Sequence, residues 1–161
     1  MERDNRSKKL TVQQAKERIQ RYCAYQERCH QEVRQKLFEY GLYSSQVDEI
    51  LTQLITDGFL NEERFAKAFA GGKFRIKKWG RIKITHELEA RNVSKNCIKI
   101  GLREIDDADY EDTLKAVLQK KLATIDAENV FVVRDKLSHY AIQKGYESEM
   151  VWRFIKEMIP C

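Results

Sequence analysis

The chain has 161 residues, of which 34% are charged, and its 30 basic and 25 acidic residues give a formal net charge of +5. Seven glycines and one proline are too few for the many tight turns of a β-sandwich or a β-barrel, so the composition favours an all-α protein. No apolar run approaches the roughly 20 residues of a membrane span, and the first ten residues lack the apolar core of a signal peptide, which predicts a soluble, cytoplasmic protein.

The beginning of the chain predicts a short tail followed by helices. Residues 1–10 are charged and aperiodic, so we expect a disordered tail. Thr11 and Gln14 have the spacing of a capping box and predict the start of a first helix. The same spacing recurs at Cys29 and Glu32, where a second helix should begin with a weaker cap, because cysteine caps less well than serine.

The second helix should end at Gly41, because glycine readily adopts the left-handed conformation that follows many helices. Ser44 and Ser45 are candidate caps of a third helix, which Asp57-Gly58 should end. Residues 11–60 therefore form one small unit of three helices.

The most distinctive stretch of the sequence begins at Asn61, a candidate N-cap, and carries an amphipathic helix as far as Lys78. The helix should break near Trp79 and Gly80, since glycine disfavours a helix interior, and a second amphipathic helix should follow. The residues expected on the apolar stripe of the first of these helices are Phe65, Phe69, Gly72 and Ile76.

The pattern of apolar residues and turns found in the first unit recurs twice. Aligned on the residue after the second helix, the copies are 51 and 53 residues apart, and the equivalent positions are Gly41, Asn92 and Gly145. In the third copy, a first helix is expected from Tyr110 to about Ala123, with Asp109 as its cap.

This repeat predicts the fold class: an all-α, elongated and curved array of three tandem three-helix repeats, each of helix-turn-helix type. One unit alone buries little apolar surface, so neighbouring units must pack together. The expected units are residues 11–60, 61–106 and 107–161, with the acidic run 104–109 marking the last boundary. We expect the protein to be a monomer.

The middle unit holds the basic excess of the chain. Residues 1–60 have a net charge of +1, residues 61–103 of +8, and residues 104–161 of −4. A run of lysine and arginine can be no more than a solvated helix face, but aromatic residues lie among these cations, as they do in many nucleic-acid interfaces. Besides Phe74 as a possible anchor, the candidate binding residues are Lys73, Arg75, Lys77, Lys78, Trp79, Arg81 and Lys83.

The sequence offers no catalytic constellation. The three histidines are scattered, no nucleophile has a nearby base, and Gly71-Gly72-Lys73 lacks the rest of a P-loop. The four cysteines have no CxxC spacing and favour free apolar side chains, with a disulfide or a zinc site as the alternative. We expect no catalytic residues, no cofactor and no bound metal, and we interpret the protein as a binding protein rather than an enzyme.

The chain resembles the RecX family of regulators of the RecA recombinase over residues 15–159. The family's central signature is similar to Asn61-x-x-Arg64-Phe65-Ala66-x-x-Phe69, followed by Lys73, Gly80, Ile84-x-x-Glu87-Leu88 and Arg91. Its first motif is similar to Tyr25-x-x-Arg28-x-x-x-Glu32 with Leu37 and Tyr40-Gly41, and its third is similar to Lys136-Leu137-x-x-Tyr140 with Lys144-Gly145-Tyr146. The chain departs from the family pattern at Cys29, Asn92 and Ala141, where Ser, Gly and Leu are common.

The resemblance implies a non-enzymatic protein that binds the RecA–DNA filament and inhibits or modulates its recombinase, ATPase and coprotease activities in DNA repair and the SOS response. The expected partners are the RecA filament and single- or double-stranded DNA, bound weakly and without sequence specificity, and no membrane. Two alternatives stay open: an autonomous DNA-binding protein of helix-turn-helix type, and a helical scaffold for another partner. The first is disfavoured because Asp48 and Glu49 make its recognition helix acidic.

Overall fold

The computed structural model describes residues 9–160 of the chain. Over that range the chain forms nine α-helices and one π-helical turn, and no strand. In order, the elements are α1 (Val12–Tyr25), α2 (His30–Glu39), α3 (Ser44–Thr56), α4 (Glu62–Gly72), η1 (Lys73–Lys77), α5 (Arg81–Ala90), α6 (Lys95–Leu102), α7 (Asp107–Leu122), α8 (Val130–Gln143) and α9 (Ser148–Met158). None of these helices has both the length and the apolar composition that crossing a bilayer requires.

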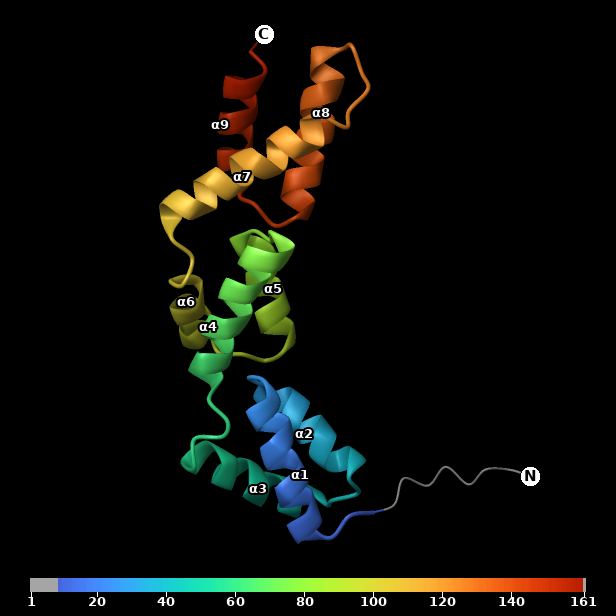
Figure 1. The fold of residues 1–161 in the computed structure, drawn as a ribbon, viewed down its shortest axis with the longest axis vertical. Coiled ribbons are helices and arrows are strands. Elements are labelled where there is room, and N and C mark those ends of the chain that lie inside the picture. Colours follow the sequence, from blue (N-terminus) through green and yellow to red (C-terminus); the bar gives the residue numbers. More distant parts are fainter. Residues whose placement is uncertain (1–8, 161) are drawn as a thin grey trace, which may run out of the picture.

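The helices stack in three groups along one axis, so that the molecule is elongated (Figure 1). Unit one comprises α1, α2 and α3, unit two comprises α4, η1, α5 and α6, and unit three comprises α7, α8 and α9. The order along the axis follows the order along the chain. This arrangement confirms the predicted all-α array of three-helix repeats.

The expected tail lies mostly outside the described residues, which begin at residue 9. Its last two residues are attached to unit one. The backbone N–H of Leu10 donates a hydrogen bond to the carbonyl oxygen of Tyr40 at 3.0 Å, and the Nζ of Lys9 lies 4.0 Å from the centroid of the Tyr43 ring. Unit one therefore includes residues 9 and 10, which the sequence had placed in the tail.

Two helix starts follow the expected capping chemistry. Thr11 forms both hydrogen bonds of its capping box with Gln14, and Asn61 accepts a hydrogen bond from the backbone N–H of Arg64 at 2.8 Å. Cys29 occupies the N-cap of α2 without a side-chain hydrogen bond, as expected for a poor cap. These residues fix where α1, α2 and α4 begin.

Two other helix starts differ from the expectation. The N-cap of α3 is Tyr43 rather than Ser44 or Ser45, because the Gln46 side chain reaches back and accepts the Tyr43 backbone N–H at 2.9 Å. The N-cap of α7 is Asp106 rather than Asp109: its carboxylate accepts the Asp109 backbone N–H at 3.0 Å, so α7 begins at Asp107 instead of Tyr110. In both cases a hydrogen bond between the observed N-cap and the residue three positions after it sets the start of the helix.

The turn after the second helix is the same in each unit. Gly41, Asn92 and Gly145 have φ angles of +87°, +57° and +101°. These are the positions on which the sequence repeat was aligned, and Asn is the residue that best tolerates the left-handed region after Gly. The repeat is therefore also a repeat of backbone conformation.

The end of the central helix departs from the sequence expectation. The α-helix stops at Gly72 and continues as the π-helical turn η1, so the apolar stripe does not reach Ile76, which is 79% exposed. Phe74 is buried in its place and is 7% exposed. A π-helical turn takes more residues per turn than an α-helix and therefore changes which side chain faces the core. The π-helical turn is followed by its C-cap residue, Lys78, whose φ is +58°.

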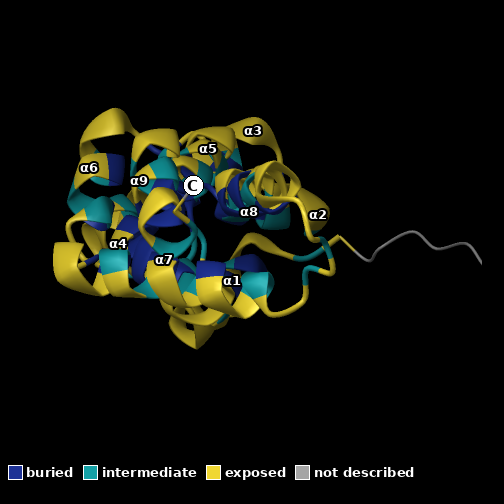
Figure 2. Ribbon diagram, turned by 90° about the horizontal axis from the view of Figure 1, so that it is seen from above, coloured by how far each residue is buried: buried dark blue, intermediate teal, exposed yellow. Residues whose placement is uncertain are grey.

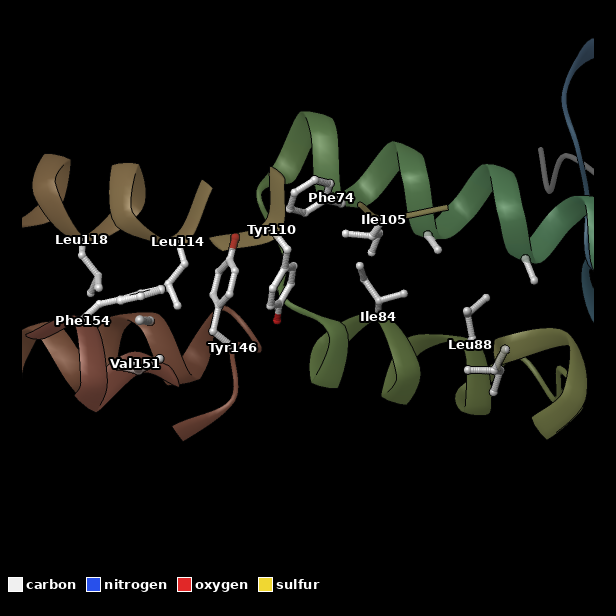
Figure 3. Close-up of a cluster of buried hydrophobic side chains, with 14 of the residues drawn as sticks. Phe74, Ile84, Leu88, Ile105, Tyr110, Leu114, Leu118, Tyr146, Val151 and Phe154 are labelled. Carbon is white, nitrogen blue, oxygen red and sulfur yellow. The ribbon is translucent and has the colours of Figure 1, made fainter. Parts of the chain in front are cut away.

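The buried apolar side chains form two clusters. One belongs to unit one alone, and the other runs through units two and three without interruption. Figure 3 shows the second cluster where the units meet: Phe74 and Ile84 of unit two face Tyr110 and Tyr146 of unit three. Seen from the end, exposed residues cover the outward faces of the helices (Figure 2). Units two and three are thus one hydrophobic body.

Candidate nucleic-acid interface

The seven candidate residues lie in three different environments rather than on one uniform face. Lys73, Trp79 and Lys83 gather around aromatic rings, Lys77 and Lys78 lie where units two and three meet, and Arg81 is part of that junction. Arg75 is exposed, and its guanidinium folds back over Gly71, where an added Cβ would come within 2.8 Å of it.

The aromatic strip, as we call it, consists of Phe69, Lys73, Trp79, Lys83 and Arg91. The Trp79 ring lies edge-on to the Phe69 ring, with centroids 6.4 Å apart. The Nζ atoms of Lys73 and Lys83 lie 5.1 and 4.6 Å from the Trp79 centroid. These distances are typical of cation–π contacts, which hold each cation while leaving its hydrogen-bond donors available.

Arg91 is a member of the strip that the charge pattern did not select. Its guanidinium lies 4.8 Å from the Phe69 centroid and donates hydrogen bonds to the backbone oxygen and the carboxylate of Glu87 at 2.8 and 3.0 Å. Arg91 comes after the basic run in the sequence and reaches the strip only because α5 packs beside α4. Charge and spacing alone do not separate it from an ordinary surface arginine, although it belongs to the central family signature.

Phe74 is not available as an interface anchor. Its side chain is buried, and its ring lies 5.8 Å from that of Tyr110 across the contact between units two and three. The expectation that Phe74 binds a partner was wrong because the π-helical turn rotates it into the core. Trp79 is half-buried, so its inward edge packs against Phe69 while part of its ring stays accessible.

The second joint, the contact between units two and three, is made by backbone as well as side chains. The backbone N–H groups of Gly80 and Ile82 donate to the carbonyl oxygens of Lys144 and Gly145 at 2.8 and 2.9 Å. A Cβ on Gly80 would lie 2.2 Å from the carbonyl carbon of Gly145. Only glycine lets the two backbone segments of the chain come this close.

Arg81 belongs to the second joint. Its guanidinium pairs with the carboxylate of Asp107 at 2.5 Å and lies 3.9 Å from the centroid of the Tyr110 ring. Its backbone N–H donates to the Tyr110 hydroxyl at 3.1 Å, and that hydroxyl donates to the Glu147 carboxylate at 2.9 Å. Burial raises the pKa of Tyr110 far above its usual value, so the hydroxyl stays protonated and keeps donating.

Lys77 and Lys78 form a bend that leaves unit two and touches unit three. The Nζ of Lys144 donates to the carbonyl oxygen of Lys77 at 3.2 Å, and the Tyr146 hydroxyl donates to that of Lys78 at 2.8 Å. Unit three thus contacts the backbone of the bend, and the side chains of Lys77 and Lys78 are exposed to solvent. Within the described residues, no ion pair is formed by Lys73, Arg75, Lys77, Lys78 or Lys83.

Comparison with known protein families assigns two parts of the chain. The sequence model of the RecX second three-helix domain matches residues 61–102, and that of the RecX third three-helix domain matches residues 108–155. The chain is 28% identical to the regulatory protein RecX of Prosthecochloris aestuarii over 86% of this chain and 89% of that protein. It is 27% identical to the Clostridium botulinum protein of the same name over 80% of this chain and 60% of that protein.

Another relative, the regulatory protein RecX of Bacillus cytotoxicus, is 22% identical and is matched over only 51% of its length. The chain therefore spans between about half and nine-tenths of the length of these relatives.

The fold is shared with solved structures. The crystal structure of RecX from Lactobacillus salivarius superposes with a TM-score of 0.81 at 18% identity, over 91% of this chain and 96% of that one. A second RecX crystal structure gives a TM-score of 0.82 at 19% identity, over 91% and 71% of the two chains. Since the two matching domain families cover more than half of the sequence, the chain belongs to the RecX family.

Proposed function

We propose that the protein is a non-enzymatic regulator that binds the RecA–DNA filament and restrains its recombinase, ATPase and coprotease activities in DNA repair and the SOS response. Its relatives carry the name regulatory protein RecX. The observation that carries the proposal is the middle of the elongated array, where Lys73 and Lys83 of the aromatic strip and the two lysines of the bend have no acidic partner among the described residues.

The electrostatics of the middle unit favour a polyanionic partner. A nucleoprotein filament exposes a regular row of phosphates, and each lysine that meets a phosphate releases condensed counterions. Lys73 and Lys83 are held on the Trp79 ring, so they lose less side-chain freedom on binding than free lysines would. An interface of this kind supplies affinity without reading base sequence.

The fused core of units two and three supports a restraining role. A body that holds one shape can bind neighbouring sites of a filament only in the arrangement that fits it, and so opposes changes in that arrangement. The proposed inhibition of filament growth and of ATP hydrolysis follows from this mechanism.

The test is the ATPase activity of RecA filaments preformed on single-stranded DNA. We expect the protein to suppress ATP hydrolysis at or below an equimolar ratio to RecA, and we expect Lys73→Glu/Lys83→Glu to lose most of this inhibition. The matched control is Arg21→Glu/Lys156→Glu, which makes the same change of charge at exposed residues of α1 and α9. Equal inhibition by both variants would show that the strip is an ordinary solvated face.

The same purified protein, without RecA, tests the alternative of an autonomous DNA-binding protein. In α3, the helix that would read the DNA, the charged residues are Asp48 and Glu49 and none is basic, which disfavours contact with DNA phosphates; Asp48 is paired with Arg34 at 2.8 Å. Tight, sequence-dependent DNA binding in the absence of RecA would favour the alternative over filament regulation.

A further inference from the structure

A group of lysines surrounds a cavity beside the second joint, on the acidic third unit. The cavity has a volume of about 270 Å³, and its walls include Lys78, Lys120, Lys121, Lys144, Thr124 and Tyr140. We call it the lysine pocket. Sequence reasoning selected only one of these lysines, because residues 104–161, which include unit three, have a net charge of −4.

Units two and three both contribute to the walls of the lysine pocket. Lys78 comes from the bend, Lys120 and Lys121 from the last turn of α7, and Lys144 from the C-cap of α8. The Gly80–Lys144 backbone hydrogen bond of 2.8 Å joins the two sides. Residues distant in the sequence are therefore held at fixed positions around one cavity, which is how binding sites are usually built.

Tyr140 orders two of the lysines. The Nζ atoms of Lys121 and Lys144 lie 4.8 and 5.7 Å from the centroid of its ring. Lys144 is also held by its hydrogen bond to the carbonyl oxygen of Lys77, and Lys78 by one to the carbonyl oxygen of Arg75 at 2.8 Å. Each of these lysines keeps further N–H donors for a ligand.

The positive charge of the pocket is not neutralised by the chain. No carboxylate lines the cavity, and among the described residues none of its four lysines forms an ion pair. Lys120 and Lys121 also stabilise the C-terminal end of α7 through the helix dipole, but Lys78 and Lys144 have no such role there. Four cations around one cavity repel each other, and a bound anion relieves that repulsion.

We propose that the lysine pocket binds phosphate groups, and specifically the sugar–phosphate backbone of single-stranded nucleic acid. The cavity is smaller than the roughly 300–1,000 Å³ typical of pockets for whole small-molecule ligands, so it suits phosphate better than a complete nucleotide. A second cavity of about 520 Å³ shares Lys121, Thr124 and Tyr140 as walls, and adds Lys136 and His139 together with one carboxylate, Asp126. A strand that passes from one cavity to the other runs past Tyr140, over whose ring the ammonium groups of Lys121 and Lys144 lie.

The lysine pocket adds unit three to the nucleic-acid surface of the proposed function. Only the role of the pocket in RecA regulation rests on that proposed function; its binding of nucleic acid does not. Its test uses free DNA without RecA. The binding of a labelled oligothymidine is measured by fluorescence anisotropy over a series of salt concentrations, for the intact chain and for Lys120→Gln/Lys121→Gln. The matched control is Lys115→Gln/Lys156→Gln, which removes two exposed lysines of the same unit that lie outside the pocket.

We expect the Lys120→Gln/Lys121→Gln variant to bind more weakly, and the slope of log K against log salt concentration to become shallower by about 1.4, the value for two lost phosphate contacts on single strands. The control should keep the slope of the intact chain, and thermal unfolding should show that both variants are folded. Equal slopes for all three proteins would overturn the proposal.

A competition measurement identifies the source of the phosphate. Inorganic tripolyphosphate should displace the oligothymidine only at concentrations far above those of the DNA phosphates. Displacement at low concentration, lost in Lys120→Gln/Lys121→Gln, would show a small-anion site and overturn the assignment to a strand. If the slopes behave as expected but RecA ATPase is not inhibited, the pocket stands and the proposed function fails, so the two failures are distinguishable.

Discussion

The two joints of this array use different chemistry. In the first joint, between units one and two, Arg64 of α4 pairs with Glu27 at 2.5 Å and donates to the carbonyl oxygen of Gly58 at 3.0 Å. Both charged side chains are partly exposed to solvent. In the second joint, Tyr110 and Tyr146 are fully buried, with ring centroids 5.2 Å apart, and they continue one core from unit two into unit three.

Within residues 9–160, Cys29 is the one buried apolar residue of unit one that belongs to the core of its neighbours. It lies at the start of α2, is 1% exposed and belongs to the cluster of units two and three instead of the cluster of unit one. Burial raises the pKa of its thiol, so it stays protonated and behaves as a small apolar side chain. The single sulfur and the solvent-accessible ion pair of the first joint contribute far less to stability than the buried aromatic rings of the second joint.

The difference between the joints indicates which units of the array behave as one rigid body. Units two and three are stabilised as one body and carry the bend, the aromatic strip and the lysine pocket. Unit one has its own core and is connected through polar, solvent-accessible contacts, so its orientation can change at a lower free-energy cost.

Replacing Gly80 with Ala should produce the largest effect, because the new Cβ would lie 2.2 Å from the backbone of Gly145. We expect a loss of about 3 kcal/mol in the free energy of unfolding, since a backbone cannot move aside as a flexible side chain can. Urea unfolding followed by circular dichroism measures it. Gly72→Ala is the matched control: its Cβ meets nothing within 4 Å, and alanine favours the helix, so it should be neutral or stabilising. Similar losses for both variants would contradict the assignment of Gly80 to a tight joint.

Replacing Tyr110 with Phe should cost about 1–3 kcal/mol in the free energy of unfolding. The change keeps the ring but leaves the Arg81 backbone N–H and the Glu147 carboxylate without the hydroxyl that joins them. Chemical unfolding measures the loss, with Tyr25→Phe as the control because that side chain is 83% exposed. A Tyr110 variant as stable as the control would mean that water replaces the hydroxyl without loss.

The second joint should weaken at alkaline pH. Burial raises the pKa of Tyr110 and Tyr146 above the value of about 10 expected in the unfolded chain. Below that pH both tyrosines are protonated in both states, and their contribution is complete. Above it the unfolded chain ionises first, so each tyrosine lowers the free energy of unfolding by about 1.4 kcal/mol per pH unit.

The measurement is the free energy of unfolding between about pH 10 and 11, compared between the intact chain and Tyr146→Phe. Lysines titrate in both proteins, so the difference in slope isolates the tyrosine. The variant should show the shallower decline, and identical declines would mean that Tyr146 ionises in the folded protein as readily as in the unfolded one.

Replacing Arg64 with Gln should give the smallest change in stability, below about 1 kcal/mol, because its ion pair is solvent-accessible. It should instead broaden the distribution of distances between probes on units one and two, measured by pulsed electron spin resonance. Arg34→Gln is the control, since it breaks an exposed ion pair inside unit one. Equal distributions for the two variants would show that Arg64 does not fix the first joint.

The sequence alone predicted the helices, the repeat and most of the turns. Gly41, Asn92 and Gly145 were aligned from spacing alone, and all three adopt positive φ angles. Such features depend on interactions within a few residues, and local chemistry determines them. The missed caps at Tyr43 and Asp106 are errors of one to three residues within the same chemistry.

The candidate site was predicted less completely. The basic run was recognised, but Phe74 proved to be core, Arg81 proved to be part of the second joint, and Arg91 was not selected. These outcomes depend on the π-helical turn and on the packing of α5 beside α4, neither of which has a signal in the spacing of residues.

The order of the amino acids is therefore sufficient to predict an all-α repeat with its positive charge in the middle. Tertiary packing determines how the units meet: one joint through Arg64 and Glu27, the other through buried aromatic rings and a glycine contact. It also decided that Lys78, Lys120, Lys121 and Lys144 surround one cavity. The physical reason is that helix formation depends on neighbours in the chain, whereas burial and charge clustering depend on which residues distant in the chain are brought together by packing.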